Sequence, residues 1–362
     1  MNKKLLFLLL LTTSSFALDE INHSHLNVRS LGMGNTKTLT GQYDQNLYGN
    51  PARATADKEW KVQLLNIGSQ FNSTGIGNIV SAASGDLSIE KLAETAGKNS
   101  KAHIQILLPS AFFQSGRWNF GLAIKLATDV NVNLRKSYEV ATESLLDSDF
   151  SFLISRSFLY QDALSFGLST HAGYRVSVPE GYTFVDLIQG NSISPTVSGR
   201  EGFRVDFDLG FTYRLPWHFF GFFIETGGSV NNLLGGQYKQ FSIHPLNLAL
   251  GPIYTPRNYN IGVALKKDHL SILKDFALSV EFNELGANQN GSIFRNIHIG
   301  VEALLSSIVS LRGGINQGYW AAGLGLDFWI LEMDFATYGE EISLNAGGIQ
   351  DRRYAFQMAF QI

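Results

Sequence analysis

The chain ends in YAFQMAFQI, residues 354–362, where large apolar residues alternate without a break with small or polar ones. A period of two is the pattern of a β-strand whose two faces meet different surroundings. The same split recurs in FRVDFDLGFTYR, residues 203–214, where one face is apolar and the other carries four formal charges. Either strand alone fits a soluble β-sandwich as well as a membrane barrel, so the number and spacing of such segments must decide.

The N-terminus carries a secretion signal. Lys3 and Lys4 precede an apolar run over residues 5–11 that is too short to span a bilayer, and Ser15-Phe16-Ala17 is a small-x-small cleavage site. We therefore expect residues 1–17 to be a signal peptide. No later stretch reaches the roughly 18 apolar residues of a membrane helix. A chain that crosses a bilayer must then cross it as strands.

Composition narrows the function classes. The 362 residues include 36 glycines, 26 phenylalanines and no cysteine, and the net charge is -3. This balance argues against nucleic acid as a partner, and without disulfides the fold depends on backbone hydrogen bonds and packing. The eight histidines are scattered, and neither a nucleophile elbow nor an H-E-x-x-H helix occurs. We expect no catalytic residue, no metal and no cofactor.

Alternating segments recur from about residue 58 to the end, near the ten-residue length of a tilted membrane strand. The predicted strands cover residues 60–71, 102–114, 117–129, 148–159, 163–177, 202–214, 218–230, 256–266, 273–283, 294–304, 307–316, 318–328, 330–338 and 352–362. These are about fourteen, an even number, as in single-chain bacterial barrels. Short connections, such as residues 215–217, alternate with long ones, as periplasmic turns alternate with outer loops. The tight connection at Gln317-Gly318 breaks this rule.

Aromatic residues lie near the ends of the predicted strands: Trp60, Trp118, Tyr160, Trp217, Trp320, Trp329 and Tyr338. In a barrel they would form two interfacial girdles. A soluble sheet would also contain aromatic residues, so this observation supports the barrel only together with the strand count.

Strand parity predicts what faces the lumen. Eight glycines fall on that side: Gly121, Gly167, Gly173, Gly210, Gly262, Gly300, Gly323 and Gly325. Because strands keep glycine where another backbone approaches closely, we expect chain inside the lumen. The charged residues on the same faces are Lys125, Arg175, Arg204, Asp206, Glu281, Glu302 and Asp334. Confined charges need partners, so we expect ion pairs that brace the barrel and anchor its contents. For His171 and His298, a hydrogen-bonded lining is favoured over catalysis.

Residues 18–57 precede the first strand and lack its alternation. They contain RSLGMG at residues 29–34 and LYGNPA at residues 47–52, whose glycines and Asn-Pro pair favour tight turns. In this order, between a signal peptide and a barrel, the motifs resemble those of the FadL-like outer-membrane transport superfamily. The closing strands, with LRGG at residues 311–314 and GLGL at residues 323–326, resemble its PorV and TraF-like branch.

The resemblance implies a transmembrane antiparallel β-barrel of about fourteen strands over residues 58–362, with residues 18–57 folded inside the lumen as a hatch. The hatch would be seated and shaped by Arg29, Gly32, Gly34, Asn50, Pro51 and Ala52. The protein would lie among the lipids of the outer membrane of a Gram-negative bacterium, inserted there by the barrel assembly machinery.

The leading interpretation is a channel for uptake of hydrophobic small molecules, such as long-chain fatty acids, whose hatch rearranges and whose ligand leaves sideways through the wall. The alternative is a PorV-like structural or adaptor protein that binds a secretion partner protein. In the first long loop, Leu87, Ile89 and Leu92 at helical spacing could offer the ligand an apolar groove, or only cap the barrel rim. An enzyme is least favoured, because the sequence displays no clustered nucleophile and base.

Overall fold

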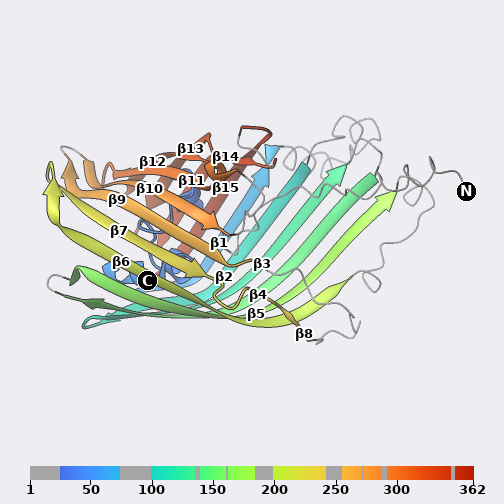
Figure 1. Cartoon of the computed structure of the whole chain (residues 1–362), viewed down its shortest axis with the longest axis horizontal. Helices are drawn as coiled ribbons and strands as arrows, with labels where there is room; N and C mark the ends of the chain where they lie inside the picture. Colours follow the sequence, from blue (N-terminus) through green and yellow to red (C-terminus); the bar gives the residue numbers. More distant parts are fainter. Residues whose placement is uncertain are drawn as a thin grey trace, which may run out of the picture.

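The computed structural model describes residues 25–73, 99–134, 139–159, 162–183, 199–241, 255–270, 273–286, 292–343 and 347–362. Fourteen antiparallel strands close into one barrel, as the alternation predicts (Figure 1). Each pairs with a neighbour on both sides, since β1 pairs with β15 and β5 with β6. Closure of this kind satisfies the backbone polar groups that lipid cannot. Among the described residues, no helix is both long enough and apolar enough to cross a membrane.

The barrel strands are β1 (Lys61–Asn72), β2 (Asn99–Ser115), β3 (Trp118–Leu134), β4 (Glu139–Phe158), β5 (Leu164–Thr183), β6 (Arg200–Phe219), β7 (Phe222–Asn231), β9 (Asn258–Leu270), β10 (Leu273–Leu285), β11 (Ile297–Leu304), β12 (Val309–Asn316), β13 (Tyr319–Asp327), β14 (Leu331–Glu341) and β15 (Gln350–Gln361). A two-residue strand, β8 (Lys239–Gln240), adds to β6 at Gly202 and Phe203. A 3-10 helix, η3 (Ile293–Asn296), precedes β11.

Five adjacent strands, β2 to β6, are longer than predicted. β4, β5 and β6 each have 20 residues, about twice the 9–11 that a bilayer requires. One side of the barrel therefore extends further at the end that carries the long connections (Figure 1). Outside the hydrocarbon layer a strand needs no apolar face, so the alternation that guided the prediction fades before the strand ends.

The connection predicted at residues 215–217 was misplaced. β6 continues to Phe219, and the turn lies at Phe220 and Gly221. The β6–β7 register shifts between Arg214 and His218. Pro216 therefore lies in an irregular stretch, where a missing backbone N–H is tolerated. The tight connection at Gln317-Gly318 is present between β12 and β13.

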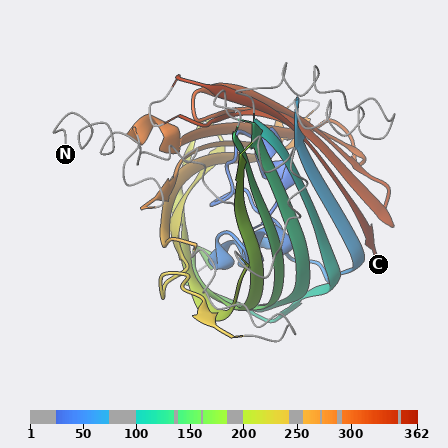
Figure 2. The same cartoon turned by 90° about the vertical axis from the view of Figure 1, so that its right-hand side faces the viewer.

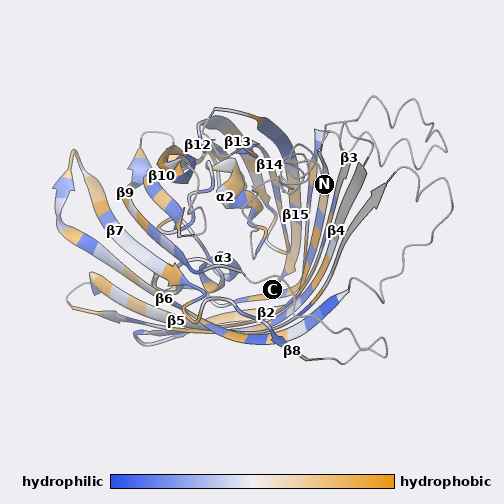
Figure 3. Cartoon of the chain, turned by 45° about the vertical axis from the view of Figure 1, so that its right-hand side comes forward, coloured by the Kyte–Doolittle hydropathy of each residue, from blue (hydrophilic) through white to orange (hydrophobic). Residues whose placement is uncertain are grey.

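The two faces of the wall differ in polarity (Figure 3). Along β6, Phe203, Val205 and Leu209 are exposed on the outside, whereas Arg204 and Asp206 are buried inside. The five tryptophans near strand ends are exposed on the outside, as a girdle requires: Trp60, Trp118, Trp217, Trp320 and Trp329. Tyr338 was wrongly assigned to a girdle, because the even positions of β14 face inward and its ring is buried. Tyr160 lies outside the described residues.

Residues 25–57, called the hatch below, fold inside the barrel (Figure 2). They form α2 (Val28–Gly32), α3 (Asp44–Leu47) and the 3-10 helix η1 (Pro51–Ala56). Two apolar clusters attach the hatch to the wall. In the first, Leu26, Val28 and Leu31 pack with Ala321, Ala336, Tyr338 and Ala355. In the second, Leu47, Tyr48 and Ala54 pack with Leu107, Phe112, Ala123 and Leu153. The signal-peptide region lies outside the described residues.

Candidate functional site

The hatch backbone touches the wall at glycines. A Cβ built on Gly167 would come within 3.0 Å of the Pro51 backbone, and one on Gly300 within 3.0 Å of the Met33 carbonyl. Gly32 and Gly323 meet backbone to backbone in the same way. Larger residues at these positions would displace the hatch. Of the eight glycines predicted to face the lumen, four contact the hatch: Gly167, Gly210, Gly300 and Gly323. The other four make room for wall side chains: Gly121, Gly173, Gly262 and Gly325.

Gly34 fits between two strands of the wall. Its φ is +66°, in the left-handed region that glycine adopts without steric cost. A Cβ there would come within 3.0 Å of the carbonyl oxygens of Ile299 and Ile315. The Gly34 carbonyl lies 2.9 Å from His298 Nδ1. His298 thus holds the hatch through a hydrogen bond.

Asn50 organises the Asn-Pro-Ala turn. Its Oδ1 accepts from the Ala52 amide at 3.1 Å and caps η1, where Pro51 takes the first position. Its Nδ2 donates to Thr38 O at 2.9 Å and to Phe211 O of β6 at 3.3 Å. One side chain therefore links two parts of the hatch and the wall.

Arg29 anchors the hatch to the opposite wall. Its Nε donates to Glu302 Oε1 at 2.9 Å, and its Nη2 pairs with Glu302 Oε2. Glu302 also accepts from Arg312 Nε at 2.7 Å, and Arg312 pairs with Asp334. Arg29, Glu302 and Asp334 are buried, and the Arg312 side chain is 5% exposed. They form an alternating chain of charges from the hatch into β11, β12 and β14, the arrangement that confined charges need.

Glu281 holds the middle of the hatch through backbone amides. Its carboxylate accepts from the N–H groups of Lys37, Thr38 and Leu39 at 2.8, 2.9 and 3.1 Å. Charge-assisted bonds of this kind are roughly twice as strong as neutral ones. Glu302 of β11 and Glu281 of β10 therefore fasten the hatch from two different strands.

Tyr48 lies at the centre of an aromatic stack. Its ring centroid is 4.4 Å from that of His25 and 5.3 Å from that of His171, with interplanar angles of 20° and 24°. Lys125 Nζ lies 4.6 Å from the Tyr48 centroid, a cation–π contact. Burial lowers the pKa of His25 and raises the pKa of Tyr48. Both hatch side chains are therefore neutral at neutral pH.

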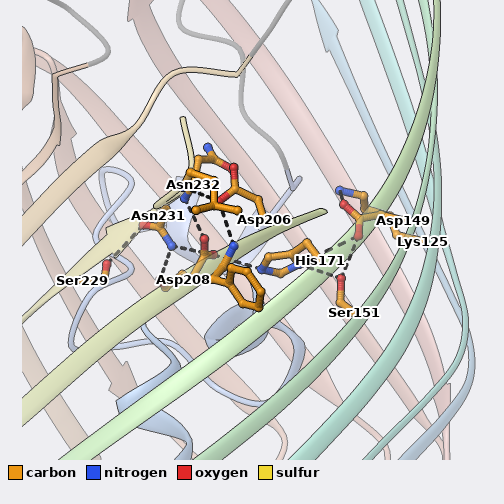
Figure 4. A network of polar contacts seen from close by, with 12 residues as sticks. Lys125, Asp149, Ser151, His171, Asp206, Asp208, Ser229, Asn231 and Asn232 are labelled. Carbon is orange, nitrogen blue, oxygen red and sulfur yellow. Dashed lines mark hydrogen bonds and ion pairs between the residues drawn. The ribbon is translucent and has the colours of Figure 1, made fainter. Parts of the chain in front are cut away.

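The wall beneath Tyr48 carries a polar network (Figure 4). His171 Nδ1 lies 2.8 Å from Ser151 Oγ, and Nε2 lies 3.1 Å from Asp208 Oδ2. Asn231 Nδ2 donates to Asp208 at 2.8 Å and to the Gly49 carbonyl at 2.7 Å. Both ends of the network thus reach consecutive hatch residues.

Ser151, His171 and Asp208 contact one another in the arrangement serine–histidine–aspartate that catalytic triads have. The sequence analysis did not predict this cluster. Several features favour a structural role. Tyr48 covers the imidazole, and the serine hydroxyl donates its hydrogen to Asp149 at 3.0 Å and not to His171. The surrounding strand amides are paired in the ladder, which leaves them unable to serve as an oxyanion hole. The cluster therefore has a structural role: it belongs to the part of the wall on which the hatch rests.

The remaining predicted lumen residues are also buried, and each has a partner. Asp206 accepts from the Leu234 and Gly236 amides at 2.8 and 2.7 Å and so fixes the segment after β7. Arg175 donates to both oxygens of Asp147 at 2.6 Å. Arg204 donates to Asn232 Oδ1 at 3.1 Å. Lys125 Nζ lies 3.8 Å from Asp149. The loop residues Leu87, Ile89 and Leu92 lie outside the described residues.

Beside His25, a narrow space remains between the hatch and the wall. It holds about 30 Å³ and is lined by Gln70, Lys101, His103 and Asp129 among others. A volume of this size accommodates about one water molecule. A ligand ring cannot pass here while the hatch keeps this position.

Two apolar grooves lie on the outer face, where glycines thin the wall. One holds about 550 Å³ and is lined by Leu209, Phe211, Val230 and Ile261, with Gly167 and Gly210 at its floor. Behind these two glycines lie Asn50 and Pro51 of the hatch. The second, about 560 Å³, is lined by Phe71, Leu324, Phe335 and Phe356 and includes Gly323, which contacts Gly32. Both grooves are thus separated from the hatch by backbone alone at these positions.

No protein-family model and no curated protein sequence matches the chain. Solved structures do. The Ralstonia pickettii toluene transporter TbuX is 14% identical, with 94% of this chain and 98% of that chain covered and a TM-score of 0.53. The CymD monoaromatic hydrocarbon channel (12% identical, TM-score 0.55) and the Pseudomonas putida toluene transporter TodX (11%, 0.50) are covered to the same extent. At this identity the likeness concerns the fold: the chain adopts the fourteen-stranded barrel of these channels.

Proposed function

We propose that the protein is an outer-membrane channel that takes up hydrophobic small molecules through a barrel closed by the hatch. The observation that carries this proposal is the contact of Asn50 and Pro51 with Gly167 and Gly210, directly behind an apolar groove. TbuX and CymD, which have the same fold, are a toluene transporter and a monoaromatic hydrocarbon channel. We also propose that the barrel lies in the outer membrane. Short turns at one end and long connections at the other are typical of outer-membrane barrels.

The groove over Gly167 and Gly210 is the proposed exit. Its volume of about 550 Å³ falls within the roughly 300–1,000 Å³ of small-molecule sites. On the outside it offers apolar side chains to a ligand entering lipid. On the inside, movement of the Asn50-Pro51 turn would uncover a wall without side chains at those two positions.

The hatch residues then have distinct roles in the proposed mechanism. Arg29, Gly32 and Gly34 would hold one part of the hatch on β11, β12 and β13. Asn50, Pro51 and Ala52 would form the part that moves. Leu87, Ile89 and Leu92 of the first long loop would offer the ligand its first apolar contact. A long-chain fatty acid and toluene are the two substrates to test first.

The decisive experiment is uptake of a labelled long-chain fatty acid and of toluene by cells with the intact protein, the Asn50→Ala variant or neither. Heat-dependent gel mobility would first establish membrane insertion of both proteins. We expect uptake of at least one compound to require the intact protein and to fall in Asn50→Ala. Equal uptake with and without an inserted barrel would exclude transport of that compound. Equal uptake by both proteins would remove the role assigned to Asn50.

A PorV-like adaptor is the second candidate. Its support is the short-turn end of the barrel, where Phe220 and Trp329 are 82% and 86% exposed. Exposed aromatic residues of this kind suit a protein partner, although they suit the membrane interface equally well. Mass spectrometry of the purified protein separates the two. A stoichiometric protein partner would favour the adaptor, and a bound lipid or other hydrophobic molecule would favour the channel.

A further inference from the structure

The second apolar groove on the outer face carries an arginine and a tryptophan at the end that faces the long connections. On β15, Arg352 lies two positions before Tyr354, which lines the groove. On β13, the exposed Trp320 lies two positions before Ala322, which lines it from the other side. The Arg352 side chain reaches across β14, where Nη1 donates to Trp320 O at 2.7 Å and Cζ lies 3.3 Å from the centroid of the indole ring. A cation and an indole thus lie together above the groove.

This pair lies at the height of a membrane interface. β15 ends at the short-turn end of the barrel, where Gln361 N donates to Ile330 O. Arg352 precedes Ile362 by ten residues, which at about 3.3 Å per residue and a tilt of about 40° corresponds to about 25 Å along the barrel axis. The apolar band of an outer-membrane barrel has about that height. Arg352 and Trp320 therefore lie at the interface on the side of the long connections, and the groove lies just inside the hydrocarbon layer.

Arg352 brings a charge to this interface that the described part of the chain does not neutralise. Within the described residues Arg352 forms no ion pair, and its Nη2 has no hydrogen-bond partner. The next residue, Arg353, points into the lumen and pairs with Glu340 and with Asp351. Two consecutive arginines thus serve opposite faces of the wall. The one on the outer face keeps N–H groups for an anion from the bilayer, and the planar guanidinium suits the oxygens of a phosphate.

We propose that this groove binds an anionic lipid, with an acyl chain along the groove and the lipid phosphate at Arg352. Phe71, Leu324, Phe335 and Phe356 offer the chain an apolar lining. The volume of about 560 Å³ falls within the roughly 300–1,000 Å³ of small-molecule sites. Basic side chains beside membrane-spanning segments bind lipid headgroups in this way. The inference rests on the proposed membrane location and goes beyond the uptake function, because it does not depend on which compound is carried.

The two outer grooves lie behind different parts of the hatch. Gly323, which lines the second groove, contacts Gly32 of α2. Arg29 of the same helix pairs with Glu302 of the wall. This is the part of the hatch that we expect to stay in place, whereas the first groove lies behind the turn that we expect to move. A lipid in the second groove would therefore remain bound during transport and support a fixed part of the wall.

The test is native mass spectrometry of the purified full-length barrel in detergent. The protein is titrated with dipalmitoyl phosphatidylglycerol or with dipalmitoylglycerol, which has the same chains and no phosphate. Heat-dependent gel mobility would first establish the folding of each variant. The native protein should bind phosphatidylglycerol about tenfold more tightly than the diacylglycerol, the effect of a charge-assisted hydrogen bond. Arg352→Gln should remove this preference and leave the affinity for the diacylglycerol unchanged.

Three further variants separate the parts of the site. Arg352→Lys keeps the charge, so its affinity for phosphatidylglycerol should stay within about threefold of the native value. Arg117→Gln is the matched control, because it removes the same charge from an exposed turn at the short-turn end. It should bind both lipids as the native protein does. Ala322→Leu fills the groove from the outside and should weaken the binding of both lipids.

The proposal is overturned if Arg352→Gln binds phosphatidylglycerol as tightly as the native protein does, or if the native protein binds both lipids equally. Displacement of the lipid by inorganic phosphate at millimolar concentration would identify a site for a free anion and would also overturn it. The mass spectra report the other occupants as well. A barrel dimer, or bound toluene, that is lost in Ala322→Leu would assign the groove to a second copy of the chain or to the transported compound.

These results can be separated from the fate of the uptake function. Uptake of a fatty acid or toluene together with unchanged phosphatidylglycerol binding in Arg352→Gln would sustain the channel and overturn the lipid site. Selective binding of phosphatidylglycerol without uptake of any tested compound would support the lipid site and reject the channel.

Discussion

Asn50 Oδ1 occupies the volume that a side chain at Gly210 would need, since a Cβ built there would come within 3.0 Å of it. Across the same contact, Asn50 Nδ2 donates to Phe211 O at 3.3 Å. Hatch and wall therefore meet without an intervening wall side chain on β6, just behind the apolar groove. A substitution in the hatch or in the wall at this contact therefore tests whether the contact holds the hatch in place.

Gly167→Ala should prevent the hatch from seating on β5. The added methyl would meet the Pro51–Ala52 peptide, which cannot move aside as a flexible side chain could. Overpacking of this kind costs about 1–3 kcal/mol. We expect the barrel to keep its heat-dependent gel mobility while the hatch becomes more sensitive to protease.

Gly313→Ala is the control for this substitution. Gly313 also lies within a strand, but a Cβ there would make only ordinary contacts, the nearest at 3.7 Å from Val301. Its protease pattern should match that of the native protein. Equal sensitivity in both variants would mean that the effect comes from alanine in a strand and not from the hatch contact.

Arg29→Met should loosen the hatch while the wall keeps its ion pairs. Glu302 would retain Arg312 at 2.7 Å, so the wall keeps its own ion pair. The hatch loses the contact with Glu302 and, within itself, the hydrogen bonds of Arg29 to Thr40 O and Gln45 Oε1. The cost should be roughly 2–3 kcal/mol of hatch docking, at the lower end for a buried pair because Glu302 keeps one cation. Amide exchange of residues 28–32 would measure it.

A double-mutant cycle with Glu302→Gln separates direct pairing from indirect effects. Coupling near zero between the two substitutions would contradict the assigned pair. Because both side chains are buried, the coupling should change little with salt concentration, unlike that of a surface pair.

The barrel could be predicted from the sequence because each membrane strand repeats one physical requirement, an apolar outer face. That requirement gave the strand count and the lumen side of positions such as Gly167 and Glu302. It gave no information where strands leave the bilayer, so the ends of β4 and β5 were missed. The prediction for Tyr338 was wrong because an aromatic residue near a strand end can lie in an outer girdle or face inward and contact the hatch.

The candidate site was less accessible from sequence. Ser151, His171 and Asp208 come together because β4, β5 and β6 are neighbours in a particular register, in which Ser151 pairs with His171. The spacing of these three residues along the chain does not predict that pairing. Tyr48 did carry a signal, since it lies within the LYGNPA motif next to Asn50. Its stacking partners are 23 residues before it and 123 residues after it in the chain.

Glu281→Gln should weaken the docking of hatch residues 37–39 on the wall. The effect should exceed that of removing a carboxylate charge elsewhere in the wall. The carboxylate accepts three backbone N–H groups, whereas an amide offers one acceptor oxygen and would turn an NH₂ toward a donor. We expect a loss of about 1–3 kcal/mol in protection of residues 37–39 from exchange. Glu332→Gln is the control, because Glu332 pairs with Lys61 of β1 and should leave these amides protected. Equal loss in both variants would contradict the direct contact.

Hatch docking should depend on pH through Asp57. Asp57 Oδ2 accepts from the Tyr43 amide at 2.9 Å and from Asn46 Nδ2 at 2.8 Å. Burial raises the pKa of Asp57 from 3.8 to about 6, against the opposing effect of Arg53. Between these two values the docked hatch binds more protons than the released hatch, so docking weakens as pH rises toward 6 and changes little above it. Amide exchange of residues 43–46, corrected for intrinsic rates, should show roughly fiftyfold greater protection at pH about 4 than at pH about 8. Asp57→Asn should remove this dependence, whereas Asp162→Asn, at a half-exposed surface pair with Lys58, should retain it. A pH profile that survives Asp57→Asn would assign the titration to another group.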